Sequence, residues 1–543
     1  MRRLGLGLGL FVVSACGCGQ VSKSDSEPSA DSGPQAVPLV FLTADLATDR
    51  AVLNALDNDG THRELSTLQL DSRYTNPIGS VLYEEDLVMV PSPDGRYVAW
   101  VCPECWQSQT PSAPDGGLEI VDSAGKNSTK TIISRYSDNS RILGWSPDGR
   151  WLALLLYESG GTWQTVITDP SGELLEIPGF EAWAPDSRMI AYTRSGSTDN
   201  TVHLHTYSLD GVDREIARDV HLFGGASVWS PDGTRLLYLK APGTRDDPAA
   251  LFSIRAAARD GSGAQTIFAG PWWDYRDLPQ FYTWSRDGQA VLIHGRNPER
   301  IVLATLDGAT RTVARLEKPS QFRAGTEYYP FLESPAGGRI VYATDLPTSR
   351  VLRTVDLDGG NEREWASATR DPDDPDDPYD NKPPFQYNDP TLVWIWDPRG
   401  RHALFSSGSG DLPEVRSADV ESGEDFPLTF GSQGTKAGFS PGGSHVVFRE
   451  TLGIDPETWR GLFQYVAAAP DGWGKVVLAP GLFGYLADGE QVATAHENAI
   501  VFQRFGEPPL VVWQGNEDVV LKAIRFPIDP DPSHRLGDTR TDY

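Results

Sequence analysis

The segment Trp229–Leu239 reads WSPDGTRLLYL, and it decides the fold. An aromatic residue ends one short extended run, and Ser230-Pro231-Asp232-Gly233 then reverses the direction of the chain. Proline presets its own φ in such a turn, and glycine tolerates the positive φ that the last position requires. The apolar run Leu236-Leu237-Tyr238-Leu239 follows, which is typical of a buried strand. The segment therefore predicts two antiparallel strands joined by a tight turn.

The same turn recurs along the chain at unequal intervals. Unequal intervals indicate a constant framework of strands with loops of variable length. Further copies begin at Ser92, Trp145, Trp183, Trp284 and Ser334, and weaker ones at Trp396, Phe439 and Leu486. The clearest turn pairs are Asp94 and Gly95, Asp148 and Gly149, Asp232 and Gly233, and Asp287 and Gly288.

Most copies are followed by a second hairpin with an Asp-Gly turn, as at Asp210-Gly211, Asp307-Gly308 and Asp358-Gly359. Two hairpins make four antiparallel strands, which is one blade of a β-propeller. A single blade cannot bury both of its faces, so blades must stack on one another. We therefore expect the recurring tryptophans to form the core between blades rather than a surface that stacks on a ligand.

The two ends of the repeated region complement each other. Nine copies of the turn are present, and residues 38–68 before the first copy supply three more strands without such a turn. Residues Val519–Phe526 are expected to form one more strand, which follows the last repeat and belongs to none of the repeats. If this strand completes the N-terminal blade, the exposed sheet edges disappear. We expect an all-β fold of about ten four-stranded antiparallel blades, either one large ring closed by the C-terminal strand or two smaller propellers.

The strand and turn W-S-P-D-G-[RKT], followed by an Asp-Gly hairpin, resemble the TolB-type, WD-like β-propeller repeat. The resemblance covers residues from about 38 to 527. It implies the fold but no particular activity, because this repeat serves many functions. TolB proteins carry a separate α/β domain before their propeller. We expect no such domain here, so membership of the Tol–Pal machinery is not implied.

The first residues are typical of an export signal. Arg2 and Arg3 precede the apolar run Leu4–Val13, which is too short to cross a bilayer. Val13-Ser14-Ala15-Cys16 resembles the bacterial lipobox, which implies a lipoprotein signal peptide at residues 1–15 and an acylated Cys16. A plain secretory peptide cut near the same place is the alternative. The resemblance implies a lipid-anchored protein of the bacterial envelope, at the outer membrane and facing the periplasm or the exterior.

The remaining domain boundaries follow from composition. Residues 16–36 are rich in Ser, Asp, Pro and Gly, which predicts a flexible tether. Residues 37–527 form the propeller domain, and residues 528–543 are expected to be a disordered tail.

Two segments invite a chemical interpretation. Cys102 and Cys105 form a CxxC pair, for which a local disulfide is favoured over a free or metal-bound pair and over catalytic redox chemistry. The insertion 371–380 is dense in aspartate, and a solvated acidic loop is favoured there over a calcium site. Residues 57–60 resemble the opening of a calcium loop, but they lie where other units have their hairpin turn.

The histidines define no metal site by their spacing. His203 and His205 alternate on one predicted strand and so share a face. His402 and His445 occupy equivalent positions in successive repeats. The sequence contains no Walker A motif or dinucleotide fingerprint, and its G-x-S-x-G match at Gly438–Gly442 belongs to the repeated turn that begins at Phe439. We therefore expect no catalytic residues, no bound metal and no cofactor.

Composition and charge narrow the class of function. Hydrophobic residues make up 39% and charged residues 22%, as in ordinary globular proteins. The net charge of −28 argues against nucleic acid as a partner, because phosphate backbones would be repelled. The favoured hypothesis is a non-enzymatic scaffold that binds a protein or glycan partner through its loops. The alternative is an envelope polysaccharide lyase or hydrolase, which would need His, Asp and Arg from several blades in one pocket of the funnel.

Overall fold

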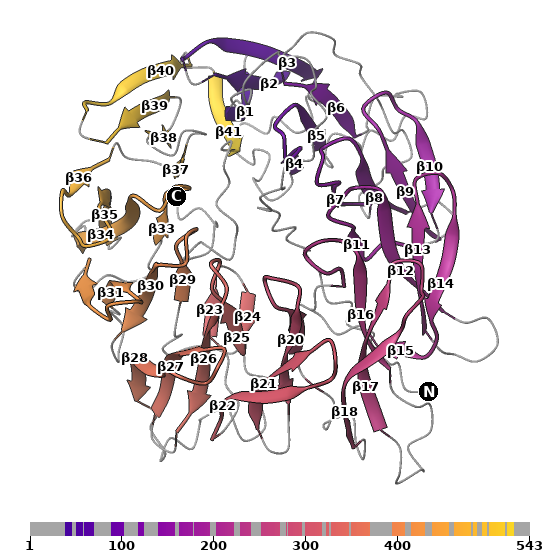
Figure 1. The fold of residues 1–543 in the computed structure, drawn as a ribbon. Coiled ribbons are helices and arrows are strands. Elements are labelled where there is room, and N and C mark those ends of the chain that lie inside the picture. The colour runs from indigo at the N-terminus through magenta and orange to yellow at the C-terminus, as the bar shows by residue number, and fades with distance from the viewer. Residues whose placement is uncertain are drawn as a thin grey trace, which may run out of the picture. The chain divides into compact units, whose positions relative to one another are not determined.

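The structure is a computed structural model of the 543-residue chain (Figure 1). It describes residues 39–45, 50–57, 59–69, 88–101, 118–123, 140–157, 162–177, 179–195, 202–221, 228–240, 251–271, 279, 281–295, 299–317, 322–324, 327–346, 349–369, 394–407, 414–428, 437–454, 461–478, 482–485, 491–496, 499–505, 507–515 and 519–525. No helix among these residues is long and apolar enough to cross a membrane.

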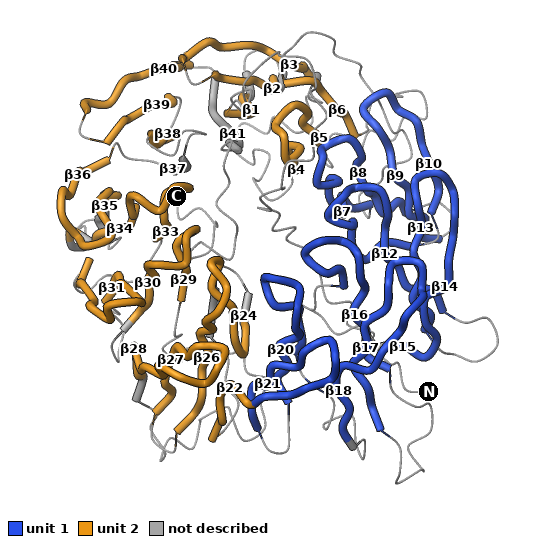
Figure 2. The backbone as a smooth tube through the Cα atoms, viewed as in Figure 1, with its two compact units in different colours: residues 1–24, 135–311 blue, residues 25–134, 312–543 orange. Residues whose placement is uncertain are grey.

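The described chain is all-β and contains ten small antiparallel sheets, the blades of a ten-bladed β-propeller, together with one two-stranded hairpin. The predicted fold class and the predicted number of blades are confirmed. The chain divides into two compact units (Figure 2). Unit 1 holds the described residues within 135–311, and unit 2 holds those within 25–134 and 312–543.

Unit 1 contains four blades of four strands each, and β22 runs across the boundary between the units. The strands are β7 (Arg141–Trp145), β8 (Leu152–Tyr157), β9 (Trp163–Thr168) and β10 (Leu174–Ile177); β11 (Ala182–Trp183), β12 (Met189–Ser195), β13 (Val202–Ser208) and β14 (Asp213–Ala217); β15 (Val220–His221), β16 (Arg235–Lys240), β17 (Leu251–Ala258) and β18 (Gln265–Pro271); and β19 (Phe281–Trp284), β20 (Ala290–Gly295), β21 (Arg300–Thr305) and β22 (Thr310–Arg315).

Unit 2 contains the other six blades and a small hairpin of β23 (Phe322–Ala324) and β24 (Glu327–Tyr329). The blade strands are β1 (Leu39–Asp45), β2 (Arg50–Leu56), β3 (His62–Gln69) and β41 (Val519–Arg525); β4 (Val88–Pro91), β5 (Tyr97–Val101) and β6 (Glu119–Asp122); β25 (Phe331–Glu333), β26 (Arg339–Asp345), β27 (Ser349–Asp356) and β28 (Arg363–Thr369); β29 (Trp394–Trp396), β30 (His402–Ser407), β31 (Glu414–Asp419) and β32 (Asp425–Pro427); β33 (Ala437–Phe439), β34 (Val446–Ile454), β35 (Gly461–Ala468) and β36 (Val476–Val477); and β37 (Leu482–Tyr485), β38 (Gln491–His496), β39 (Ala499–Arg504) and β40 (Leu510–Gln514).

The N-terminal blade is completed by the C-terminal strand, as predicted. Strand β1 pairs with β2 on one side and with β41 on the other, both antiparallel, and the sheet order is β3-β2-β1-β41. On a face of this blade, Leu39 and Phe41 pack with Ala493 and Ile500 of the blade formed by β37–β40. The strand that begins the described chain is therefore covered on both edges, which removes an unpaired edge.

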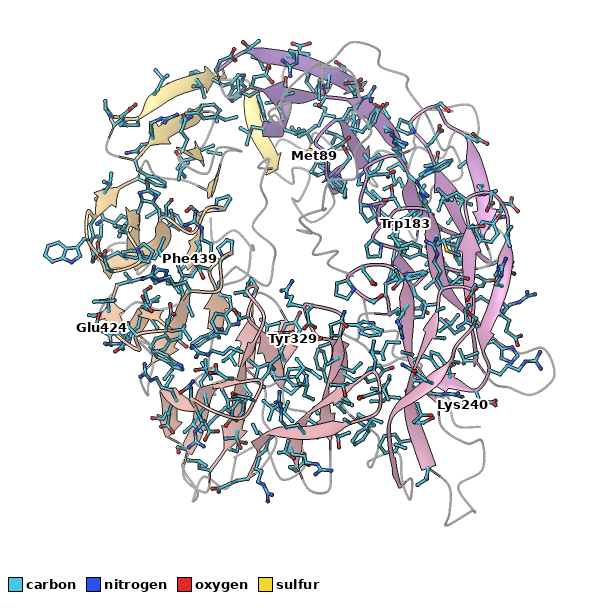
Figure 3. All side chains as sticks on the ribbon, viewed as in Figure 1. Met89, Trp183, Lys240, Tyr329, Glu424 and Phe439 are labelled. Carbon is cyan, nitrogen blue, oxygen red and sulfur yellow. The ribbon has the colours of Figure 1, made fainter. Side chains whose placement is uncertain are left out.

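The core of each unit lies between successive blades. In unit 1, Trp229 and Tyr238 pack with Ala191 and Leu204 of the blade before. The tryptophans of the repeated turn are nearly all buried, as expected for residues between blades: Trp183 (labelled in Figure 3) is 9% exposed, Trp229 3%, Trp284 4% and Trp396 1%. These side chains are therefore part of the packing and are not available to stack on a ligand.

Candidate functional site

The Ser-Pro-Asp-Gly turns share one pattern of hydrogen bonds. In the turn at Ser230, the amide of Gly233 donates to the Ser230 carbonyl at 2.8 Å. The Ser230 hydroxyl donates to Asp232 Oδ1 at 2.6 Å and accepts from the amide of Arg235 at 2.9 Å. The turns at Ser92, Ser146 and Ser285 repeat all of these bonds.

The structure places the Asp-Gly pairs of these four motif copies inside such turns. The lone glycines of the four turns, Gly95, Gly149, Gly233 and Gly288, have φ between 66° and 69°. Burial would favour the neutral form of Asp232, but hydrogen bonds from Ser230 and Thr234 outweigh it and lower the pKa of this carboxyl group. The partners of these aspartates are therefore groups of their own turns, which is a structural role.

One turn departs from the pattern in a way that links two blades. Ser187 stands where the other turns have glycine, and its φ is 61°. Its hydroxyl accepts a hydrogen bond at 2.9 Å from the amide of Asp148, which lies in the turn of the preceding blade. The departure therefore ties neighbouring turns together on the face of unit 1 that carries them.

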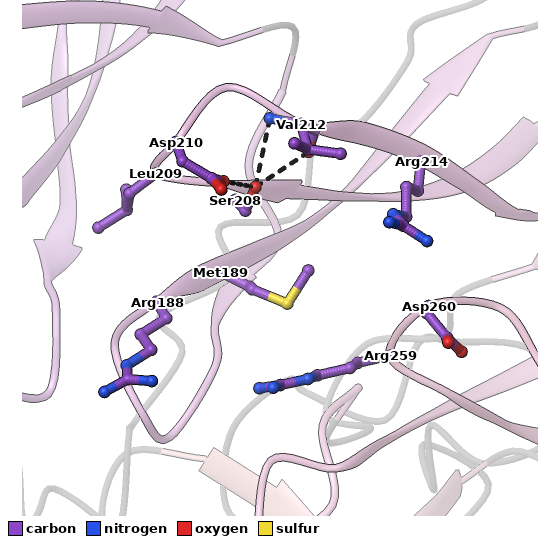
Figure 4. A pocket seen from close by; sticks show the side chains of 9 residues that line it. All are labelled: Arg188, Met189, Ser208, Leu209, Asp210, Val212, Arg214, Arg259 and Asp260. Atoms are coloured by element: carbon purple, nitrogen blue, oxygen red, sulfur yellow. Dashed lines mark hydrogen bonds between the residues drawn. The ribbon is translucent and has the colours of Figure 1, made fainter.

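A cleft of about 460 Å³ lies on this face, between two successive blades of unit 1 (Figure 4). Three segments form it: the start of β12, the β13–β14 hairpin, and the β17–β18 hairpin of the next blade. The lining residues are Arg188, Met189, Ser208, Leu209, Asp210, Val212, Arg214, Arg259 and Asp260.

Contacts between the two blades fix the walls of the cleft. The Thr206 hydroxyl of β13 donates to the Arg259 carbonyl at 3.2 Å. The Arg259 guanidinium pairs with Asp186 through Nη1 and Oδ2 at 2.9 Å. Within the first blade, the amide of Leu209 donates to the Arg188 carbonyl at 3.2 Å. The backbone positions of all three lining segments are thus held by hydrogen bonds.

The two aspartates of the cleft accept hydrogen bonds from residues of their own turns. The Ser208 hydroxyl donates to Asp210. The hydroxyl and amide of Ser262 donate to Asp260 at 2.6 and 2.9 Å, and these bonds, aided by the charge of Arg214, lower the pKa of Asp260. Bonds from neutral donors leave the charge of both carboxylates in place, so the lining carries three guanidinium groups and two carboxylates.

Arg188 is a cationic group that the cleft leaves open, in addition to Arg214, whose charge acts on Asp260. The amide and carbonyl of Arg188 take part in the turn, but among the described residues no carboxylate pairs with its guanidinium. The side chain is exposed at the cleft mouth, beside Met189 and Leu209 (Figure 4). A guanidinium with five donors in a planar fork is suited to a carboxylate, and the arrangement can bind an anionic group.

The sequence did not single out this cleft. Its arginines come from three turns of two blades, and no spacing along the chain relates Arg188 to Arg259. A signal was nevertheless present, because arginine follows the turn glycine or serine at Arg96, Arg150, Arg188 and Arg401, and of these four Arg188 lines this cleft.

Several predicted residues lie outside the described part of the chain. These are Cys16, Cys102, Cys105 and the insertion 371–380. Of the residues that resemble a calcium loop, Asp57 pairs with Arg63 and Asp59 Oδ1 accepts from the amide of Thr61 at 2.9 Å. Both carboxylates thus have turn and strand partners.

The structure places the noted histidines in different surroundings. His203 and His205 share a face of β13 and stand beside carboxylates of β14. His402 lies 3.8 Å from both Asp397 and Asp419, whereas His445 stacks on Phe505 with ring centroids 4.0 Å apart. Among the described residues, the first pair belongs to a group of three potential metal ligands, with Glu215 as the third.

Comparison with known proteins relates the chain to TolB over a short stretch. No family model matches. The Tol-Pal system protein TolB of Anaeromyxobacter dehalogenans is 30% identical over 118 residues, which is 20% of this chain and 25% of that protein. TolB of Desulfosudis oleivorans is 31% identical over 102 residues, 18% of this chain and 23% of that protein. The chain spans about a quarter of the length of these curated relatives, so the homology is distant and partial.

Solved structures with a similar fold include two of different function. TolB from Acinetobacter baumannii matches with a TM-score of 0.25 and 13% identity, over 62% of this chain and 81% of that chain. An oligogalacturonate lyase in complex with manganese matches with a TM-score of 0.35 and 12% identity, over 60% of this chain and 88% of that chain.

Proposed function

We propose that this chain is a non-enzymatic binding protein of the bacterial cell envelope, and that its cleft at Arg188 receives an acidic group of a protein or glycan partner. The observation that carries the proposal is the Arg188 guanidinium, which faces a cleft and has no carboxylate partner among the described residues. Because the chain has a net charge of −28, an anionic group would be attracted by the local arrangement of guanidinium groups in the cleft and not by the overall charge of the protein.

The lyase or hydrolase alternative gains no specific support from the cleft. That alternative needs a general base or a metal beside the arginines. The lining combines Arg and Asp from two blades, but it includes no histidine, and its serine hydroxyl is bonded to Asp210. Binding without chemistry is therefore the function that these residues favour.

The location in the envelope rests on two supports. The relatives that match are named as proteins of the Tol-Pal system, which supports an envelope protein. The lipobox-like residues Val13–Cys16 support a lipid anchor on Cys16. With Cys16→Ser, we expect the protein to leave the membrane fraction of cells that express the full chain. If the variant still needs detergent for extraction, the anchor is not at this cysteine.

The test of the cleft compares two equivalent arginines. Arg188→Glu changes the residue after the turn in the blade of β11–β14, and Arg150→Glu changes the corresponding residue in the blade of β7–β10, which does not line the cleft. The probes are alginate, as an acidic glycan, and poly-glutamate, as an acidic peptide, with dextran as the neutral control. Binding is measured by biolayer interferometry with the full chain.

We expect Arg188→Glu to weaken binding of at least one acidic probe by about 10-fold or more, because a charged hydrogen bond contributes roughly 1.5–3 kcal/mol. Arg150→Glu should bind nearly as the parent does. The probe that responds tells whether the partner is a glycan or a protein. Equal loss in both variants would show a diffuse charge effect, and no binding of either acidic probe by the parent would contradict the proposal.

A further inference from the structure

The β13–β14 hairpin carries a second group of polar side chains on the face opposite the cleft. Side chains alternate along a strand, so Arg214 faces the cleft while Asp213 and Glu215 face the other way. His203 and His205 of β13 lie on that same face, with His205 opposite Glu215 in the register. The two imidazole rings are almost parallel, at 7°, with centroids 6.5 Å apart.

Each histidine stands next to a carboxylate. His203 Nδ1 lies 3.3 Å from Glu215 Oε2, and His205 Nδ1 lies 3.1 Å from Asp213 Oδ1. The Tyr192 hydroxyl donates to the same Asp213 oxygen at 2.7 Å. Asp213 thereby orients the His205 ring and, by accepting the proton on Nδ1, leaves the lone pair on Nε2.

Glu215 is oriented by a neighbouring arginine. Arg218 Nε donates to its Oε1 at 2.6 Å. The other oxygen, Oε2, faces His203. Ligand atoms of His203, His205 and Glu215 all lie within 4.8 Å of one another. Around a tetrahedral Zn²⁺ with bonds of about 2.0–2.1 Å, ligand atoms are roughly 3.4 Å apart. Small side-chain rotations would therefore close the site.

A second blade has an arginine at the register position of His205. In the blade of β25–β28, Arg353 occupies the register position of His205, opposite Glu364 as His205 is opposite Glu215. Tyr342 donates to Glu362 there, as Tyr192 does to Asp213. Arg353 Nη2 lies 3.0 Å from Glu364, so one fixed positive charge stands between the two acids.

The β11–β14 blade has histidines at two of these register positions. His205 stands where the other blade has Arg353, and His203 stands where it has Val351, so a pair of histidines lies beside two carboxylates. A cation bound to the two imidazoles would place a positive charge where the other blade has its guanidinium. The exposed position of Arg218, at 64%, makes it a weak substitute.

We propose that His203, His205 and Glu215 bind a divalent first-row transition cation, best matched by Zn²⁺, with Asp213 orienting His205. Two imidazoles and a carboxylate are borderline ligands that suit Zn²⁺ better than Ca²⁺ or Mg²⁺. Three protein ligands leave a fourth position for water or for a group of a partner. The site lies on the hairpin that forms one wall of the cleft, but it does not depend on the function proposed for the cleft.

The test measures Zn²⁺ binding by isothermal titration calorimetry with the untagged full chain after removal of metal by a chelator. The informative variants are His203→Ala, Glu215→Gln and His205→Arg, the last of which restores the charge arrangement of the β25–β28 blade. His445→Ala is the matched control, because His445 stacks on Phe505 and is not a member of the cluster. Co²⁺ absorption in the visible range reports the geometry of the same site.

We expect the parent and the control to bind one more Zn²⁺ per chain than each cluster variant. Asp213→Asn should weaken this binding by about 10- to 100-fold without abolishing it, as for other residues that orient a ligand. His205→Arg should melt in the absence of metal at or above the temperature of the parent, which shows that it folds. Equal Zn²⁺ stoichiometry and affinity in the parent and the cluster variants would overturn the proposal.

Discussion

The buried tryptophans of unit 1 allow a matched test of the bonds that join blades. Trp229 Nε1 donates to the Ala182 carbonyl of the preceding blade at 3.3 Å, and Trp183 does the same to the Gly144 carbonyl at 3.3 Å. Trp284 occupies the equivalent position and is 4% exposed, but its Nε1 has no hydrogen-bond partner among the residues that the structure describes. Substitution by phenylalanine therefore removes a bond at one position and an unsatisfied donor at the other.

The expected difference follows from these two terms. Both Trp→Phe changes lose similar packing, because Trp229 and Trp284 are buried to nearly the same extent. Trp229→Phe also loses a hydrogen bond worth roughly 0.5–1.5 kcal/mol, whereas Trp284→Phe relieves a buried donor that costs roughly 1–3 kcal/mol. The bond is long, so we expect Trp229→Phe to be the less stable variant by about 2 kcal/mol.

The assay is unfolding in urea, followed by circular dichroism so that the change in tryptophan content does not affect the signal. Both residues lie in unit 1, so both variants report on the same unit. With a urea dependence of about 2 kcal/mol per molar, the two midpoints should differ by about 1 M. Trp183→Phe should resemble Trp229→Phe. Equal midpoints, or a lower midpoint for Trp284→Phe, would refute the view that indole bonds contribute to the stacking of blades.

Three more outcomes are expected. Gly233→Ala should lower the thermal stability by about 1 kcal/mol or more, seen in calorimetry, because φ is 68° and the new Cβ would lie 3.2 Å from Pro185; an unchanged melting temperature would argue against strain at the turn. Asp232→Asn should reduce the loss of stability at acid pH, because the pKa of Asp232 lies below its usual 3.8 in the folded state. The ionised carboxylate therefore stabilises the fold above pH 3.8, and this stabilisation is lost as the pH falls through the lower folded pKa. Melting curves between pH 2 and 6 measure the effect, and the same pH dependence in the variant and the parent would contradict it. Deletion of residues 519–543 removes β41 and should make β1 accessible to limited proteolysis; protection equal to that of the parent would contradict the pairing.

The blades could be predicted from the sequence because their determinants are local. The serine, aspartate and glycine of each turn form hydrogen bonds within six residues, as at Ser230. The sequence motif therefore contains all the groups that stabilise the turn. The closing strand could be predicted because the N-terminal unit had three strands instead of four, and the strand at Val519–Phe526 belonged to no other unit.

The sites could not be predicted because they depend on register and on neighbouring blades. His203 and His205 share a face by simple alternation, and Glu215 stands opposite His205 in the register of the hairpin, which shifts by one residue just beyond this pair, between His205 and Leu204. The cleft likewise depends on how the Arg259 hairpin lies beside the Arg188 turn, which interactions such as the Arg259–Asp186 ion pair fix. No pattern along the chain encodes either juxtaposition.

The pairing of β1 with β41 has a consequence for how the protein must be made. All other described strands lie between these two along the chain, so the first blade waits, incomplete, while every other blade is synthesised. During this time the open edge of β1 is a template for a strand of another chain. Closing so long a loop is slow relative to forming the local hairpins. We therefore expect the last step of folding to follow synthesis and to be the step at which a chaperone protects the chain.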